Sequence, residues 1–136
     1  MSRTTTFLGE ESELVFQLEG SRRGLIISRP HGNKRYDFIT DSHGVLNRVQ
    51  VKSTLKPKNP TNLRYEIVIN KRKVYSVNEL EIFALHLVDI DLWYFIPVEI
   101  LVGKSFLSLY PHGRKSIYNN YIDNWEIFSS SRKTDL

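Results

Sequence analysis

The sequence predicts a single α/β domain in which helices flank a mixed central sheet, and three observations lead to this prediction. The chain has 136 residues, a length typical of one domain. Residues 36–54 are two strand-like segments joined by a short polar turn, and residues 82–96 are two more. Residues 9–19 and 118–128 carry apolar side chains at helical spacing. Strands and helices of this kind pack as layers around a common core.

The N-terminal part predicts a tail, a helix and a strand. Residues 1–7, with three consecutive threonines, are expected to be a loose tail, and the ordered core is expected to span about residues 8–129. Residues 9–19 form the predicted helix, which Gly20 ends. The apolar run at residues 25–28 then predicts a strand in the interior of the sheet.

Residues 36–54 are the segment that the rest of the chain is expected to surround. The turn at residues 41–44 contains Asp, Ser and Gly, which favour tight backbone geometry. In the second strand valines alternate with polar residues, so one face is apolar and the other is polar. The apolar face predicts that this hairpin lies at the centre of the sheet, with Val49 and Val51 buried.

The polar face of the same hairpin brings together Asp37, Gln50 and Lys52. If the hairpin closes symmetrically, Asp37 lies opposite Gln50, and Lys52 lies one step further along the same face. A carboxylate and an amide oxygen can bind a hard divalent cation. A lysine can orient an attacking water or stabilise charge on a phosphate. Taken alone, these residues also fit an ordinary surface hairpin with outward polar side chains.

The remainder of the chain predicts further strands and one late helix. The predicted strands span residues 63–69, 82–88, 92–96 and 106–110. The second and third of these should pair as an antiparallel hairpin, after which Pro97 opens a short helical turn. Residues 118–128 predict a helix because aromatic and apolar residues recur there at spacings of three and four. His86 is interpreted as a hydrogen-bonded strand residue and not as a metal ligand.

Composition permits a polyanionic partner and excludes several other chemistries. The chain has 19 Lys and Arg against 15 Asp and Glu, for a net charge of +4 and a pI of about 9.4. It has no cysteine, which excludes disulfides, cysteine zinc sites and thiol nucleophiles. We see no P-loop, paired-histidine zinc motif or serine nucleophile elbow. The expected location is cytoplasmic, because no signal peptide or membrane-spanning run is apparent.

Several blocks of the sequence resemble one known group of enzymes. Arg-Tyr-Asp-Phe-Ile at residues 35–39 and Arg-Val-Gln-Val-Lys-Ser-Thr at residues 48–54 resemble the PD-(D/E)XK nuclease superfamily. The nearest branch is that of the group I intron-associated homing endonucleases, in which Gln replaces the acidic residue before the Lys. Tyr36 stands where the superfamily has proline, as it does in this branch. Further similar blocks lie at residues 93–98, 109–113 and 121–128.

The resemblance implies a restriction-endonuclease-like fold and Mg²⁺-dependent hydrolysis of double-stranded DNA, with Mn²⁺ as a substitute and no small-molecule cofactor. It implies that Asp37 is the principal metal ligand, and that Gln50 and the backbone carbonyl of Val51 complete the site. Lys52 would position or activate the attacking water. The run Gly-Glu-Glu-Ser-Glu ending at Glu13 matches the pattern of the branch, whose helix glutamate points at the metal.

DNA contacts are expected from cations in the loops and turns. The pool is Arg35, Lys56, Lys58, Lys71, Arg72, Lys73, Arg114 and Lys115. One small domain with one active site cuts one strand, so cutting a duplex at a long site calls for several copies. The resemblance implies a homotetramer, with a dimer as the alternative. The chain has more aromatic residues than one small core needs, and some of the following are expected to supply part of a subunit interface: Trp93, Phe95, Tyr118, Tyr121 and Trp125.

Three other readings stay open at this point. A Holliday-junction-resolvase-like enzyme would share this core and cut branched DNA by its shape. A catalytically silent DNA-binding domain is the second reading, because Gln50 adds no charge for a cation. The third is a structural or interaction domain, which would follow if the site binds no metal.

Overall fold

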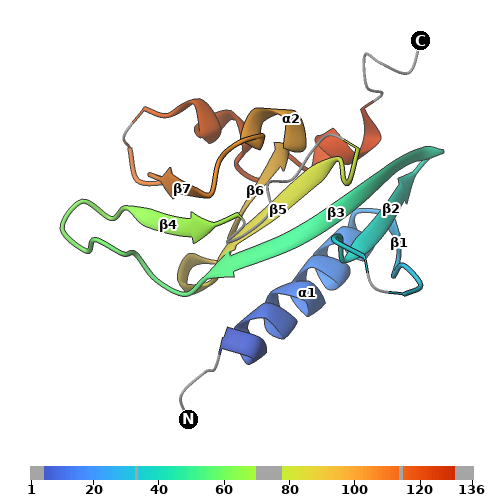
Figure 1. The fold of residues 1–136 in the computed structure, drawn as a ribbon, viewed down its shortest axis with the longest axis horizontal. Coiled ribbons are helices and arrows are strands. Elements are labelled where there is room, and N and C mark those ends of the chain that lie inside the picture. Colours follow the sequence, from blue (N-terminus) through green and yellow to red (C-terminus); the bar gives the residue numbers. More distant parts are fainter. Residues whose placement is uncertain (1–4, 33, 70–77, 114, 131–136) are drawn as a thin grey trace.

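The computed structural model describes residues 5–32, 34–69, 78–113 and 115–130. Figure 1 shows the described elements in order. They are α1 (Thr5–Arg22), β1 (Ile26–Ser28), β2 (Phe38–Ser42), β3 (Val45–Thr54), β4 (Tyr65–Val68), β5 (Ile82–Leu87), η1 (Val88–Ile90), β6 (Leu92–Pro97), α2 (Val98–Leu101), β7 (Phe106–Leu109), η2 (Ile117–Tyr121) and η3 (Trp125–Ser129).

The larger sheet of the described chain has five strands in the order β1-β2-β3-β5-β6. The pairs β1–β2, β2–β3 and β5–β6 are antiparallel, whereas β3 and β5 run parallel. The sheet is therefore mixed, and β3 is its central strand, so the predicted α/β class and the central hairpin are confirmed. Val49 and Val51 are buried on one face of β3, as predicted.

Helix α1 covers that face of the sheet (Figure 1). Phe16 of α1 lies in an aromatic cluster with Phe38, Trp93, Phe95 and Phe128, in which ring centroids lie between 5.0 and 6.3 Å apart. The end of α1 approaches β1 so closely that a Cβ on Gly20 would lie 2.7 Å from the Cδ1 atom of Ile27. Glycine at this position therefore allows the helix to pack on the sheet.

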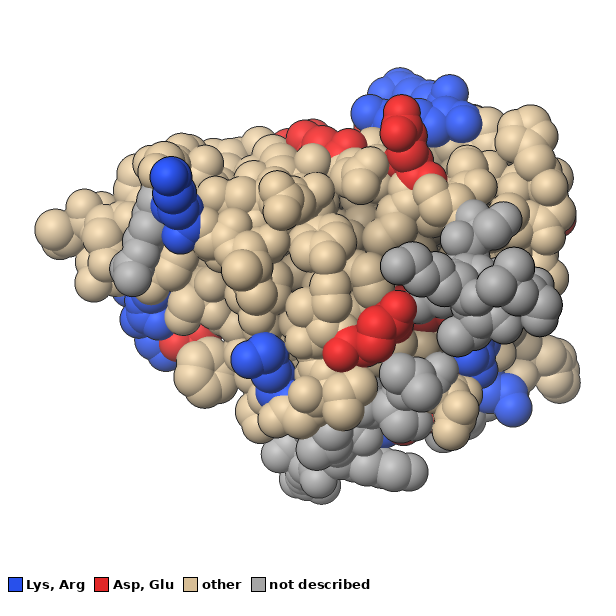
Figure 2. All heavy atoms as spheres, turned by 90° about the horizontal axis from the view of Figure 1, so that it is seen from above, with Lys and Arg blue, Asp and Glu red and all other residues tan. Residues whose placement is uncertain are grey.

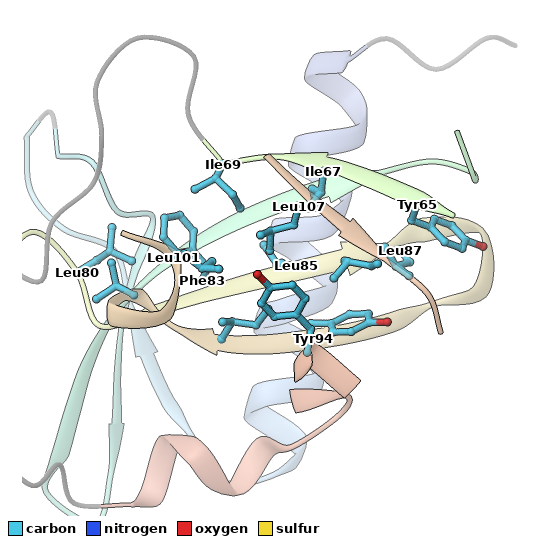
Figure 3. Packing of buried hydrophobic residues seen from close by; sticks show 14 residues of the cluster. Tyr65, Ile67, Ile69, Leu80, Phe83, Leu85, Leu87, Tyr94, Leu101 and Leu107 are labelled. Atoms are coloured by element: carbon cyan, nitrogen blue, oxygen red, sulfur yellow. The ribbon is translucent and has the colours of Figure 1, made fainter. Parts of the chain in front are cut away.

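The opposite face of the sheet is covered by a second, smaller sheet. Strands β4 and β7 pair antiparallel and contribute Tyr65, Ile67 and Leu107 to a second buried cluster. Figure 3 shows Leu107 beside Leu85 of the larger sheet, and Tyr65 at the end of the cluster near Leu87. The alternation along β6 serves both clusters, because Trp93 and Phe95 face α1 while Tyr94 and Ile96 face β4 and β7.

Two N-terminal predictions were wrong. Helix α1 begins at Thr5, within the segment expected to be a loose tail, and it ends at Arg22, beyond Gly20. Strand β1 is an edge strand and not an interior one, because it pairs with β2 at the end of the strand order. Ile26 is 69% exposed there, so the apolar run at residues 25–28 reflects contacts of Leu25 and Ile27 with the α1 side and not burial on both faces.

The predicted C-terminal helix was also wrong, because the structure has two short 3₁₀ segments, η2 and η3, in its place. Asp123 adopts a left-handed backbone conformation (φ 49°) between them, and its N–H donates to the Trp93 carbonyl at 2.8 Å. Ile122 forms an isolated bridge with Tyr94 of β6. Pairing with the sheet edge therefore replaces the helical hydrogen bonds at this point.

The aromatic residues assigned to a subunit interface mostly lie in the protein's own cores. Trp93, Phe95 and Tyr118 are buried, while Tyr121 and Trp125 are partly buried against the two clusters. The prediction that these side chains form an interface was therefore wrong for the buried ones. No helix among the described residues is long and apolar enough to span a membrane.

Candidate active site

Strand β3 changes its partner at Val49, and the candidate site lies at this change. Residues 45–49 pair with β2, while residues 49–54 pair with β5. Asp37 stands directly before β2, where the two strands separate. Its N–H donates to the Val49 carbonyl, and its Oδ2 atom accepts the Val51 N–H, both at 2.8 Å. Asp37 is therefore held against β3 by its backbone N–H and by its carboxylate.

The Val51 carbonyl is directed toward the same side of β3 as Asp37. The N–H and C=O groups of one strand residue point to the same edge, and the Val51 N–H points to Asp37. Residue 51 also lies beyond the part of β3 that pairs with β2. A backbone oxygen and a carboxylate therefore meet at the end of β2, where both can face one ligand.

Gln50 and Lys52 lie on the polar face predicted from the sequence. In the register of β3 and β5 they stand beside Phe83 and Leu85, and both are half-buried. The positive charge of Lys52 acts on Asp37, because it opposes the increase in the pKa of that carboxyl. The structure thus places Lys52 within electrostatic reach of Asp37.

Glu13 reaches the same region from α1. Its carboxylate accepts a hydrogen bond from Arg29 at 3.2 Å, and the Arg29 guanidinium lies 4.8 Å from the centre of the Phe38 ring. Burial raises the pKa of Asp37 above its ordinary value, and the nearby charge of Glu13 adds to the increase. The Val51 N–H, Lys52 and Arg29 oppose it. Arg29 belongs to this cluster, although no sequence pattern singles it out.

The donor set fits a hard divalent cation. Two carboxylates, one amide and one backbone carbonyl are the oxygen ligands that Mg²⁺, Mn²⁺ and Ca²⁺ prefer. The negative charge of Glu13 helps to raise the pKa of Asp37, and a cation between the two carboxylates would relieve this repulsion. Among the described residues no three His, Asp or Glu side chains form a metal cluster. The neutral oxygens of Gln50 and Val51, with water, would therefore have to complete the coordination.

Arg48 and Glu81 fix the neighbouring ends of β3 and β5. Glu81 accepts the backbone N–H of Arg48 at 2.6 Å and the Arg48 Nε–H at 3.0 and 3.1 Å, and it also pairs with Nη2. In return the Glu81 N–H donates to the Arg48 carbonyl at 3.0 Å. These contacts set the parallel register in which Gln50 and Lys52 lie beside β5.

His86 ties the helix that carries Glu13 to the central sheet. Its Nδ1 atom lies 2.7 Å from the Ser12 hydroxyl, its Nε2 atom lies 2.8 Å from Asp91, and its ring stacks on Trp93 at 4.1 Å. Burial lowers the pKa of His86 below its ordinary value, and Asp91 opposes the decrease. The interpretation of His86 as a hydrogen-bonded strand residue is confirmed. Because Ser12 precedes Glu13, this contact also positions the candidate ligand.

The described cations among those predicted to contact DNA lie in separate parts of the chain. Arg35 pairs with Glu79 at 2.6 Å and Lys58 with Glu66 at 3.3 Å, while Lys56 and Lys115 are exposed in separate loops. Four others, Lys71, Arg72, Lys73 and Arg114, lie outside the described residues. Figure 2 shows that on one face Lys and Arg stand in separate small groups, mostly toward its edges. The cations among the described residues of that face therefore do not form a continuous basic surface.

Comparison with known proteins gives the family of this chain. A family model for PD-(D/E)XK endonucleases matches residues 3–128. The chain belongs to this family of nucleases, whose substrate is DNA and whose members generally use divalent metal ions. No curated protein matches the chain by sequence.

Solved structures that are similar to this chain include the following two. One is I-Ssp6803I, a bacterial homing endonuclease, with a TM-score of 0.79 and 21% identity, covering 93% of this chain and 91% of that one. The other is Hjc, a Holliday junction resolvase from the archaeal hyperthermophile Archaeoglobus fulgidus, with a TM-score of 0.58 and 16% identity, covering 92% of this chain and 98% of that one. The predicted restriction-endonuclease-like fold is confirmed.

Proposed function

We propose that this protein is a Mg²⁺-dependent, site-specific endonuclease of the homing type that cuts double-stranded DNA. The observation that carries the proposal is the position of Asp37, held by Val51 where β2 and β3 separate, with Lys52 in electrostatic reach. Similarity to a bacterial homing endonuclease over most of both chains supports this type of enzyme. A cytoplasmic location and action at group I intron insertion sites are parts of the same proposal.

Each residue of the site has a distinct role in the proposed reaction. Asp37 is the principal ligand of Mg²⁺, for which Mn²⁺ can substitute, and Gln50 and the Val51 carbonyl provide neutral oxygens. Glu13 assists directly or through water. Lys52 orients the attacking water and stabilises charge on the phosphate. The cation, when bound, polarises the phosphate and favours ionisation of water.

Cleavage assays with matched variants test the assignment. Asp37→Asn and Lys52→Met should each reduce cleavage of plasmid DNA by about 10³-fold or more, while circular dichroism and DNA binding stay close to those of the wild type. Asp41→Asn is the control, because Asp41 lies on the same face of β2 and accepts the Gly44 N–H at 2.9 Å. Cutting by either site variant at the wild-type rate would refute the assignment. Chelation with EDTA should stop the reaction, and Mg²⁺ or Mn²⁺ should restore it.

The similarity to Hjc supports a second candidate, a structure-specific nuclease acting on branched DNA. The two candidates differ in substrate and not in site residues. Wild-type protein should cut a long linear duplex at one place if the first proposal is correct, and a four-way junction without regard to sequence if the second is correct. Binding to DNA without cutting in Mg²⁺ or Mn²⁺ would leave the silent DNA-binding domain.

We also propose that the protein assembles as a homotetramer, with a dimer as the alternative. Three apolar residues on α1, Phe7, Leu14 and Leu18, are 59%, 65% and 52% exposed, and spacings of seven and four place them along one stripe. Such a stripe suits a contact between copies. Light scattering should give a multiple of 15.9 kDa, and Leu14→Glu with Leu18→Glu should reduce it. Leu46→Glu, at the exposed hairpin tip, is the control. A strictly monomeric wild type, with and without DNA, would contradict assembly.

A further inference from the structure

A pocket lies beside the candidate active site. It has a volume of about 350 Å³ and is lined by Lys34, Arg35, Tyr36, Arg48 and Glu79. Three of the five lining residues are cations and one is a carboxylate, so the pocket favours an anion. Its lining comes from the loop before Asp37, from β3 and from the segment that precedes β5.

The pocket and the candidate site share one face of β3. Tyr36 directly precedes Asp37, and Arg48 stands two positions before Gln50, so both Arg48 and Gln50 project from the polar face. Side chains two positions apart on a strand are separated by about 6.7 Å. Phosphates of one DNA strand succeed one another every 3.4 Å or so along the helix axis. Because Tyr36 lines the pocket and directly precedes Asp37, a DNA strand with one phosphate at Asp37 has a neighbouring phosphate within reach of the pocket.

The two arginines of the pocket are held differently. Arg48 is fixed by Glu81 and also donates to the Asn78 carbonyl at 2.9 Å. Arg35 pairs with Glu79 at 2.6 Å, and these two side chains are 28% and 23% exposed. An anion from solvent can therefore approach the Arg35–Glu79 pair. Arginine suits phosphate because its planar guanidinium can donate two parallel hydrogen bonds.

We propose that this pocket binds a DNA backbone phosphate adjacent to the scissile one, and that Arg35 exchanges Glu79 for that phosphate. The proposal rests on the proposed function, since it needs DNA at Asp37. Glu79 then acts as a counter-ion that weakens binding of arbitrary polyanions. A strand held only at the pocket must break the Arg35–Glu79 pair without compensation, whereas a strand held at the whole site gains other contacts. Glu79 is thus a specificity-determining residue that works by opposing binding.

Binding of a short non-cognate duplex in EDTA tests the exchange. Anisotropy titrations at several salt concentrations should show that Arg35→Gln reduces the salt slope by about one unit. Glu79→Gln should raise affinity about three- to fivefold, the effect of one partly exposed ion pair. The double variant should bind like Arg35→Gln alone, because the gain requires the guanidinium.

Glu19→Gln is the matched control. Glu19 also pairs with arginines, Arg22 and Arg23, and it lies at the end of α1, on the other side of the sheet from Arg48. The control therefore makes the same change in net charge away from the pocket. An equal gain in Glu19→Gln and Glu79→Gln, or a gain that persists without Arg35, would overturn the proposal.

Two further measurements separate this proposal from the proposed function. If Asp37 is needed for cutting but the Arg35 and Glu79 variants bind like the wild type, the nuclease assignment stands and the pocket assignment fails. If the wild type binds no duplex, titration with inorganic phosphate tests the pocket independently of DNA binding. A saturable shift of the Arg35 Nε–H resonance during phosphate titration, followed by NMR and stronger in Glu79→Gln, supports the pocket, and no shift overturns it. The wild-type titration also remains decisive if a variant fails to fold.

Discussion

The two ends of β3 differ in their neighbouring strands and in their proposed roles. Residues 45–49 pair with β2 as a tight hairpin, whereas residues 49–54 pair with β5 and leave the β2 side to Asp37. Phe38 and Asp37 are adjacent in the chain and illustrate the contrast. Phe38 is buried in the aromatic cluster on the α1 side, while Asp37 contacts Val51 at the opening. The part of the sheet that supplies core packing is therefore only one residue away from the part that supplies the candidate site.

This contrast shows how a sheet can build a polar site without losing its core. Because β2 begins only at Phe38, the backbone of β3 beyond Val49 is left to Asp37. The apolar face of β3 stays covered by α1 on both sides of the change. The repulsion between Glu13 and Asp37 is thereby confined to one opening. Sites of this kind cost stability locally while the surrounding packing holds them in place.

The largest expected effect on stability is at Phe38. Phe38→Ala removes a buried ring that stacks on Phe16 at 5.5 Å, and it should reduce the free energy of unfolding by about 3–5 kcal/mol. Ile39→Ala, the neighbour on the half-buried face, is the control and should cost clearly less. Urea unfolding measures both. A loss at Ile39 equal to that at Phe38 would mean that the two faces do not differ as described.

A smaller effect concerns pH and the chemical end of β3, where His86 stands beside Ser53. The pKa of His86 is lowered from 6.5 by burial, although Asp91 and Glu11 oppose the decrease. As the pH falls below 6.5, the unfolded chain binds a proton at His86 more readily than the folded chain does. The free energy of unfolding therefore decreases as the pH decreases, by at most about 1.4 kcal/mol per pH unit. His86→Gln should reduce this dependence. Urea unfolding between pH 7 and pH 5 tests it, and an unchanged slope in the variant would contradict the assignment.

The smallest expected effect is a gain at Asp37. Burial raises the pKa of the Asp37 carboxyl above 3.8. When the pH rises through the raised pKa, the carboxyl ionises in the folded protein, and this ionised form destabilises the metal-free fold. Asp37→Asn keeps an acceptor for the Val51 N–H and should raise the melting temperature by roughly 2 °C, or about 0.5 kcal/mol. Mg²⁺ should then stabilise the wild type but not the variant in thermal unfolding. A less stable variant would mean that the carboxylate supports the fold.

The predictions from the sequence are correct where the two-residue alternation of apolar and polar side chains determines the structure. The alternation in β3 and the apolar strands β5 and β6 were predicted, and the faces of Gln50, Lys52, Val49 and Val51 followed from them. The symmetric closure that set Asp37 against Gln50 agrees with the observed register, in which Phe38 stands opposite Val49. Local geometry decides such features, so one sequence suffices.

Reasoning failed where distant contacts overruled a local pattern. The aromatic spacing of residues 118–128 fits a helix, but Asp123 and Ile122 bind the edge of β6 instead. The pairs Arg48–Glu81 and Arg35–Glu79 join residues more than thirty positions apart, and no short-range signal announces them. Arg48 was visible as a member of the polar face, but its partner was not. Contacts of this kind depend on the parallel register, which the sequence did not reveal.

The parallel pairing of β3 with β5 also has a consequence for the order of assembly. The β2–β3 and β5–β6 pairings are local hairpins, whereas Val49 reaches Ile82 only after the intervening chain, including β4, has been made. Closing such a long loop is slower than closing a hairpin. A chain emerging from the ribosome therefore carries Asp37, Gln50 and Lys52 on a hairpin long before β5 can brace them. On the proposed function, the growing chain should be unable to cut DNA until β5 has been synthesised.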